Sequence, residues 1–190
     1  MTVKAGVLAL QGDFREHALA LRDAGATPVE VRTPGQLADV ECLVLPGGES
    51  TTIGKLAHLY GLVEPIRERA EAGMPIFGTC AGMFVLAERV ECGEPLFELM
   101  DIGLQRNAYG RQVESFEADL DVRGIEHPVR GVFIRAPRIT DVGEAVEVLA
   151  EYEGAPVVLE QGNLLVASFH PELVGETALH RYLLAKTRKV

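Results

Sequence analysis

The sequence predicts an α/β fold with a mostly parallel central sheet between two helical layers. Short apolar runs alternate with segments of helical spacing through the first half of the chain, which is typical of β-α-β units. In the second half, several successive strands separated by glycine-marked turns should add antiparallel strands to the sheet. A chain of 190 residues is expected to form one domain over residues 1–190.

The first half supplies the parallel part of this prediction. In chain order, it predicts strands at residues 3–10, 29–31, 41–45 and 75–77, and helices at residues 14–24, 53–72 and 83–89. Gly25 should close the first helix, and Gly61 and Pro65 should break the second in two.

The second half begins with a polar, turn-rich segment at residues 104–116. Weak alternation follows at 118–122. The remaining predicted elements are strands at 131–137, 147–152, 156–160 and 164–169, and a closing helix at 176–186.

Composition excludes several classes of partner. The formal net charge is −10 and no basic stripe is present, so nucleic acid is not expected to bind. No apolar run approaches the roughly 20 residues that span a bilayer. Three cysteines without framework spacing indicate free thiols and a cytoplasmic protein. No clustered His/Cys pattern suggests a zinc site, and we expect neither metal nor cofactor.

A glycine-flanked cysteine is the strongest chemical signal. Gly78-Thr79-Cys80-Ala81-Gly82 follows a predicted strand and precedes a predicted helix. This is the thiol form of the G-x-S-x-G nucleophile elbow, in which a sharp turn exposes the central side chain. The helix N-terminus would favour negative charge on the sulfur. The alternative is a buried structural cysteine beside a glycine-rich turn.

His170-Pro171-Glu172 is the second signal. Pro171 favours an extended backbone at His170, and residues two apart on such a backbone project to the same side. Glu172 could then orient an imidazole that faces Cys80, the relation that activates a cysteine. An exposed histidine and glutamate in a turn would be the reading for an isolated motif.

Loops after other strands should converge on the cysteine. Gln11, the Gly47-Gly48 pair and Cys80 each follow a predicted strand, and ligands bind at the carboxyl ends of parallel strands. Backbone N–H groups of Gly47, Gly48 and Ala81 could form an oxyanion hole. A phosphate loop is the competing reading of this glycine pair, but the P-loop pattern is absent. A plain turn with a helix cap at Ser50 or Thr51 is compatible with either.

Other chemically capable residues carry weaker signals. Arg106 and Arg135 lie in punctuated loops and could hold a carboxylate, although solvated surface charges are the simpler reading of each. Cys42 should be core and Cys92 exposed. Surface or core roles are expected for the histidines without a partner pattern, which are His17, His58, His127 and His180.

These motifs together resemble a known family. Cys80 in its elbow with His170-x-Glu172 is similar to the triad of class I glutamine amidotransferases, which have a flavodoxin-like fold. More narrowly, the chain resembles the glutaminase subunit of glutamine-dependent pyridoxal 5'-phosphate synthase. The blocks that carry this resemblance, almost end to end, are Leu10-Gln11-Gly12 with Glu16-His17, Leu45-Pro46-Gly47-Gly48-Glu49-Ser50-Thr51-Thr52, Phe77 to Gly82, Arg106-Asn107 with Gly110-Arg111-Gln112, Phe133-Ile134-Arg135-Ala136-Pro137, and Ser168 to Glu172.

The resemblance implies hydrolysis of L-glutamine to glutamate and ammonia. Cys80 would attack the γ-amide to form a thioester, His170 would move the proton, and Glu172 would orient His170. The implied glutamine contacts are Gly48, Glu49, Ser50, Arg106, Ile134 and Arg135. A separate (β/α)₈-barrel synthase subunit would receive the ammonia. Gln11 would lie at the subunit contact, and association would complete the oxyanion hole.

Other readings of the same residues remain open. The chain could be a different triad amidotransferase subunit or a cysteine hydrolase of similar architecture. It could also be a binding or regulatory module that keeps the fold without chemistry, although all three catalytic residue types are present.

If His170 rests as a neutral base, kcat/KM for glutamine should fall on the acid side near pH 6–7, roughly the ordinary pKa of imidazole. A pH profile of glutamate release measures this, and a flat profile down to about pH 5 would contradict a neutral resting His170.

Overall fold

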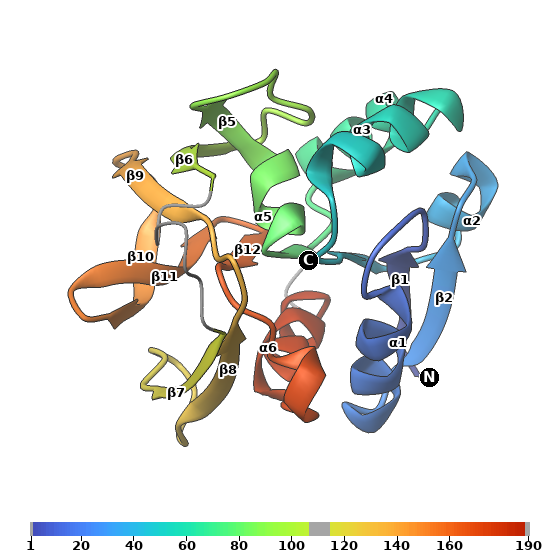
Figure 1. Cartoon of the computed structure of the whole chain (residues 1–190). Coiled ribbons are helices and arrows are strands. Elements are labelled where there is room, and N and C mark those ends of the chain that lie inside the picture. Colours follow the sequence, from blue (N-terminus) through green and yellow to red (C-terminus); the bar gives the residue numbers. More distant parts are fainter. Residues whose placement is uncertain (1, 107–114, 189–190) are drawn as a thin grey trace.

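The computed structural model describes residues 2–106 and 115–188, and it is organised around one seven-stranded sheet (Figure 1). The strand order is β10-β11-β12-β4-β3-β1-β2. The parallel strands are β1 (Lys4–Leu8), β2 (Thr27–Val31), β3 (Cys42–Leu45), β4 (Ile76–Thr79) and β12 (Leu164–Ala167), and the antiparallel ones are β10 (Glu147–Tyr152) and β11 (Ala155–Gln161). The predicted mostly parallel sheet with added antiparallel strands is therefore confirmed.

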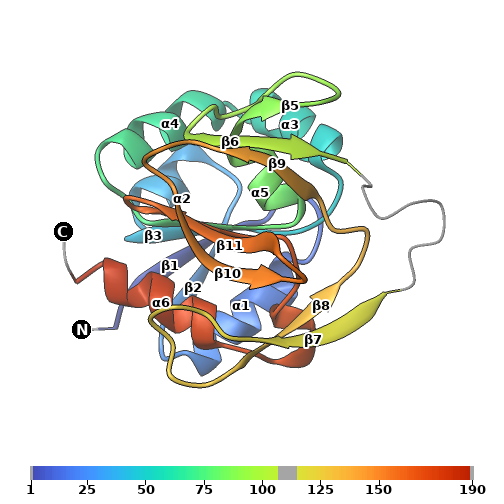
Figure 2. The same cartoon turned by 90° about the vertical axis from the view of Figure 1, so that its left-hand side faces the viewer.

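Helices cover both faces of this sheet, as predicted. Figure 2 shows α1 and α6 below the sheet and α3 and α4 above it. The helices are α1 (Phe14–Asp23), α2 (Pro34–Ala38), α3 (Ser50–Leu59), α4 (Val63–Glu71), α5 (Ala81–Leu86) and α6 (Ala178–Lys186). Two buried apolar clusters result, one containing Leu21 and Leu183 from α1 and α6, the other Ile53 and Ile66 from α3 and α4. Their burial supplies the main driving force for folding.

Two helix predictions need correction. The segment predicted at residues 53–72 does break at Gly61, but Pro65 lies in the first turn of α4, where a missing N–H costs no helical hydrogen bond. The segment predicted at 83–89 is shorter. Helix α5 ends at Leu86, and β5 (Ala87–Val90) continues the chain as a strand.

The second half contains strands that the pattern did not predict. β6 (Met100–Gln105) lies between β5 and β9 (Arg138–Val142) in a three-stranded sheet, and both β6 and β9 were missed. A separate pair, β7 (Phe116–Leu120) and β8 (Val129–Phe133), corresponds to the predicted segments at 118–122 and 131–137.

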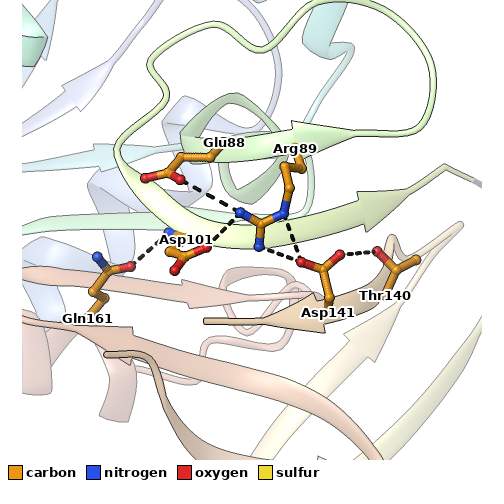
Figure 3. A network of polar contacts seen from close by, with 6 residues as sticks. All are labelled: Glu88, Arg89, Asp101, Thr140, Asp141 and Gln161. Atoms are coloured by element: carbon orange, nitrogen blue, oxygen red, sulfur yellow. Dashed lines mark hydrogen bonds and ion pairs between the residues drawn. The ribbon is translucent and has the colours of Figure 1, made fainter. Parts of the chain in front are cut away.

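A surface network ties the three-stranded sheet together (Figure 3). Arg89 on β5 lies between Asp101 on β6, at 2.6 Å, and Asp141 on β9, and the side chain of Gln161 on β11 accepts a bond from the backbone of Asp101. These side chains are well exposed, so we assign the network a role in register rather than a large stability. The β6–β9 ladder ends at the Gln105–Arg138 pair. The residues next to this pair in the chain, Arg106 and Pro137, line the cavity that is described in the next section.

Candidate active site

One cavity lies at the carboxyl ends of the parallel strands, among the loops that follow them. Its volume of about 530 Å³ suits a small-molecule ligand. The loops that follow β1, β3, β4 and β12 all contribute, as predicted from the strand-end rule. Its lining residues are Gln11, Asp13, Gly48, Glu49, Ser50, Cys80, Ala81, Phe84, Arg106, Ile134, Arg135, Pro137, His170 and Leu173.

Cys80 occupies the strained turn that the elbow motif predicts. Its φ of 48° lies in the left-handed region, which side chains other than glycine rarely adopt. A Cβ on Gly82 would collide with the carbonyl oxygen of Leu45, and one on Gly78 would come within 2.6 Å of the Gly82 oxygen. The backbone N–H of Cys80 donates to Ala167 of the adjacent strand at 2.9 Å. The surrounding strands and α5 therefore hold the turn in place.

His170 and Glu172 meet, but the backbone differs from the expected one. Pro171 is helical, with φ −71° and ψ −31°, and Glu172 begins the 3₁₀ helix η1 (Glu172–Val174). Only His170 is extended, pairing in both directions with the backbone of Val132 at 2.8 and 3.2 Å. The carboxylate therefore reaches Nδ1 of His170, at 2.8 Å, through a tight turn rather than along an extended strand.

A second carboxylate also faces His170. Oδ2 of Asp13 lies 3.3 Å from the same Nδ1. Asp13 is the N-cap residue of α1, but its side chain makes no capping hydrogen bond. We did not single out Asp13 from the sequence, although it follows β1 as closely as Gln11 does, and the strand-end rule could have found it.

The electrostatics favour a charged imidazole. Burial lowers the pKa of His170, but hydrogen bonds with Asp13, Cys80 and Glu172 outweigh it and raise that pKa to about 12. Burial raises the pKa of Glu172, yet the nearby His17 and His170 outweigh it and lower that pKa well below its ordinary value. These contacts therefore favour the protonated imidazole, and the pH dependence of the reaction tests whether His170 rests in that form.

The glycine loop after β3 is fastened to the loop after β1. The side chain of Gln11 accepts a bond from the backbone N–H of Glu49 at 2.7 Å, and the carbonyl of Gly47 accepts one from Asp13 at 3.1 Å. Gly48 has φ 151° and lines the cavity together with Ala81. Gly47 is not among the lining residues, and its Cα packs against the imidazole of His170.

Glu49 has a structural task that we did not predict. Its carboxylate caps α3 by accepting from the backbone N–H groups of Thr51 and Thr52, at 3.2 and 2.8 Å, so the cap is not Ser50 or Thr51. These bonds, first that of the Thr52 hydroxyl, lower the pKa of Glu49. The carboxylate also lies 3.7 Å from Arg106.

The two arginines reach the cavity from different loops. The guanidinium of Arg106 stacks over the ring of Phe84 at 4.4 Å from its centre. Arg135 is exposed and has a φ of 45°, so its backbone is strained beside Ile134. Asn107 and residues 110–112 of the predicted motif lie outside the described residues.

The remaining histidines and cysteines divide between core and surface. Cys42 is buried and Cys92 exposed, as expected. Burial raises the pKa of Cys42 to about 12, which keeps it a neutral thiol. His58 and His127 are exposed, while His17 and His180 are fully buried. Sequence reasoning missed that His17 contacts Glu172, at 3.4 Å.

A metal would compete with the contacts already described. Ligand atoms of Asp13, His170 and Glu172 lie within 4.8 Å of one another. A cation on Nδ1 of His170 would displace the hydrogen bond to Glu172, so this set fits the orientation of an imidazole better than a metal. Among the described residues, no helix is both long and apolar enough to cross a membrane.

Comparisons with known proteins agree with this geometry. Residues 7–189 match the family model described as the SNO glutamine amidotransferase family. A protein named "Pyridoxal 5'-phosphate synthase subunit PdxT" from Frankia alni is 57% identical over 182 residues, covering 94% of this chain and 92% of its relative. One of the same name from Pelotomaculum thermopropionicum is 55% identical, covering 97% and 95%.

Solved structures show the same fold. One described as a glutamine amidotransferase is 49% identical and has a TM-score of 0.92, covering 97% of this chain and 98% of the other. The PurLQS structure from Thermotoga maritima, at 22% identity and a TM-score of 0.74 over 100% and 99% of the two chains, shares the fold alone.

Asp13→Asn should move the alkaline limb of kcat/KM to lower pH, by roughly one unit. Asp13 raises the pKa of His170, so removing its charge lets the imidazolium lose its proton earlier. The pH profile of glutamate release measures this shift. Asp39→Asn, an exposed carboxylate at the end of α2, is the control and should leave the limb unmoved. If Asp13→Asn had the same pH profile as wild type, the contact with Asp13 would not raise the pKa of His170.

Gly82→Ala should destabilise the fold by about 1–3 kcal/mol, because the added Cβ would overlap the carbonyl oxygen of Leu45. Urea denaturation measures the change. Gly35→Ala in α2 is the matched control, since its Cβ meets only one atom, 4.0 Å away. We expect the control to be neutral or to stabilise by about 0.4–1 kcal/mol. If Gly82→Ala and Gly35→Ala changed the free energy of unfolding equally, Gly82 would not be packed against the carbonyl oxygen of Leu45.

Proposed function

The chain belongs to the SNO glutamine amidotransferase family, and we propose that it is a glutaminase that hydrolyses L-glutamine through Cys80, His170 and Glu172 to supply ammonia for pyridoxal 5'-phosphate synthesis. The observation that carries the proposal is the elbow cysteine in a cavity with a buried imidazole–carboxylate pair. We also propose that residues 1–190 act as one amidotransferase domain.

The proposed reaction uses Cys80 as the nucleophile and His170 as the group that carries the proton. The Cys80 thiolate attacks the carbonyl carbon of the γ-amide and forms a tetrahedral intermediate. The C–N bond breaks as the His170 imidazolium donates its proton to the departing nitrogen, which leaves as ammonia. The resulting γ-glutamyl thioester is attacked by a water that transfers a proton to the now neutral His170. The second tetrahedral intermediate then collapses, which releases glutamate and the Cys80 sulfur and leaves the proton on His170.

Charge that develops on the carbonyl oxygen needs donors. We assign these to the backbone N–H groups of Ala81, next to the nucleophile, and of the Gly47-Gly48 loop. Gly48 and Ala81 line the cavity, which supports the assignment. Gly47 faces His170 and Asp13 instead, so it would contribute only after the loop reorients. The Gln11 bond to Glu49 is well placed to control such a change.

The rest of the cavity suits an amino acid. Arg106 and Arg135 provide positive charge for an α-carboxylate, and Glu49 provides a carboxylate for an ammonium group. Ser50 and Ile134 complete the lining near them. Because the Glu49 carboxylate already caps α3, a substrate contact would share it with Thr51 and Thr52 rather than replace them.

A partner must use the ammonia. We propose a hetero-oligomer with a (β/α)₈-barrel synthase subunit that docks over the cavity mouth, since the relatives described above carry the name of a synthase subunit. Leu173 and Val174 leave apolar surface exposed immediately after Glu172. We place the complex in the cytoplasm because the three cysteines are unpaired thiols.

Cys80→Ala should abolish ammonia release from glutamine in the complex with a barrel synthase. Wild type should release ammonia much faster with the barrel than without it. An ammonia assay on both proteins, with and without the barrel, measures this, and mass spectrometry should detect the γ-glutamyl thioester in wild type only.

Cys92→Ala is the matched control, because that thiol is exposed and lies outside the cavity lining. It should retain wild-type activity. Ammonia release that survives Cys80→Ala would remove the mechanism, and equal wild-type rates with and without the barrel would remove the docking proposal.

A further inference from the structure

The Glu172 carboxylate is flanked by a second imidazole besides His170. Its Oε1 lies 2.8 Å from Nδ1 of His170 and 3.4 Å from Nε2 of His17. The side chains of His17 and Glu172 are completely inaccessible to solvent. Oε2 of Glu172 has no hydrogen-bond partner among the described residues. A buried negative charge with few partners is costly in free energy. The imidazoles of His17 and His170, which both face Oε1, therefore stabilise the charge of Glu172.

His17 is itself held in place from both ring nitrogens. Nε2 lies 3.0 Å from the hydroxyl of Thr79, the residue before Cys80, and Nδ1 lies 2.9 Å from Nε2 of His180. The ring of Phe77 meets both imidazoles edge-on, with centres 6.3 and 5.5 Å away. His17 comes from α1 and His180 from α6, which lie side by side under the sheet (Figures 1 and 2). The ring cannot rotate without breaking one of these contacts.

The partners decide where the protons lie. An ionised carboxylate only accepts hydrogen bonds, so Nε2 of His17 should carry a proton where it faces Glu172 at 3.4 Å. The hydroxyl of Thr79, at 3.0 Å from the same nitrogen, can accept from that proton as well. Burial, together with the neighbouring His17, lowers the pKa of His180 to about 3, so that ring is neutral. A proton shared between Nδ1 of His17 and Nε2 of His180 then fixes the orientation of His17 toward Glu172.

We propose that His17 is a positioning residue of the glutaminase, whose protonated Nε2 faces Glu172 and so keeps that carboxylate aimed at His170. This inference rests on the proposed glutaminase function. A histidine that merely fills the core would contribute to stability only. A positioning residue would also affect the rate and the pH dependence of the chemistry.

The first test compares His17→Gln with His17→Asn in the complex with the barrel synthase. The glutamine amide nitrogen reaches the position of Nε2, whereas that of asparagine stops near Nδ1. We expect His17→Asn to lower kcat for glutamine about tenfold to hundredfold with little change in KM. His17→Gln should restore most of the activity. Equal activity of both variants with wild type would overturn the proposal.

The second test is the pH profile. His17 and His170 both lower the pKa of Glu172, so losing His17 should move the acid limb of kcat/KM to higher pH. The other ionisable groups here are Asp13 and Cys80, which face His170, and His180, which faces His17; all are unchanged in the variants. An acid limb in His17→Asn that coincides with that of wild type would overturn the proposal.

Leu21→Ala separates positioning from stability. Leu21 is fully buried on α1, one turn from His17, and packs in the apolar cluster below the sheet. It should lower the midpoint of urea unfolding while the pH profile keeps its shape. If Leu21→Ala shifts the acid limb as much as His17→Asn does, the effect of His17 is structural and the proposal fails.

Alkylation of Cys80 tests the role of His17 without the synthase partner and without glutamine hydrolysis. In the Cys92→Ala background, the rate of Cys80 alkylation by iodoacetamide reports the thiolate in the full chain at each pH. We expect His17→Asn to shift this profile to higher pH and His17→Gln to shift it less. Glutamine left intact by the wild-type complex would refute the glutaminase, while unchanged alkylation profiles would refute the role of His17.

Discussion

The buried hydrogen bond between His170 and Glu172 is the interaction on which the rest of the site depends. At 2.8 Å, it fixes the imidazole ring that faces Cys80, although His170 lies ninety residues further along the chain. The pairing of the strands in the sheet brings Cys80 and His170 close together. β12 runs parallel to β4 with Ala167 beside Thr79, so the residues that follow both strands leave the same edge together.

Holding this pair has a cost that the surrounding fold must offset. Cys80 has a positive φ, Glu172 carries a buried charge, and one of its oxygens has no partner among the described residues. Such local conflicts are typical of functional sites and persist only when the surroundings over-determine them. Here the neighbouring parallel strands hold the turn at Cys80 in place. Asp13 and Glu172 both contact the imidazole of His170, and His17 contacts the carboxylate of Glu172. These contacts favour the protonated form of His170 beside Cys80.

The sequence was most informative where chemistry is encoded locally. The elbow around Cys80 was predictable because Gly78 and Gly82 are required by close backbone contacts that no other residue allows. The His170–Glu172 pairing was also predicted, and His170 is extended as expected, but Glu172 reaches it from the start of a 3₁₀ helix rather than along the same strand. Strands β6 and β9 were missed because their residues have mixed polarity and owe their conformation to each other. The place of Asp13 could have been predicted from its position after β1, but its contact with His170 was not singled out. The contact of His17 was missed because it depends on how α1 packs under the sheet, which no spacing in the chain records.

The carboxylates around His170 should hold it as an imidazolium at neutral pH. Nitrogen NMR of histidine-labelled protein measures this directly, with His170→Asn identifying the resonance. Both ring nitrogens of His170 should remain protonated through neutral pH, and one should lose its proton only well above the ordinary imidazole pKa of about 6.5. A His170 ring that is neutral at pH 8 and titrates near 6.5 would contradict it.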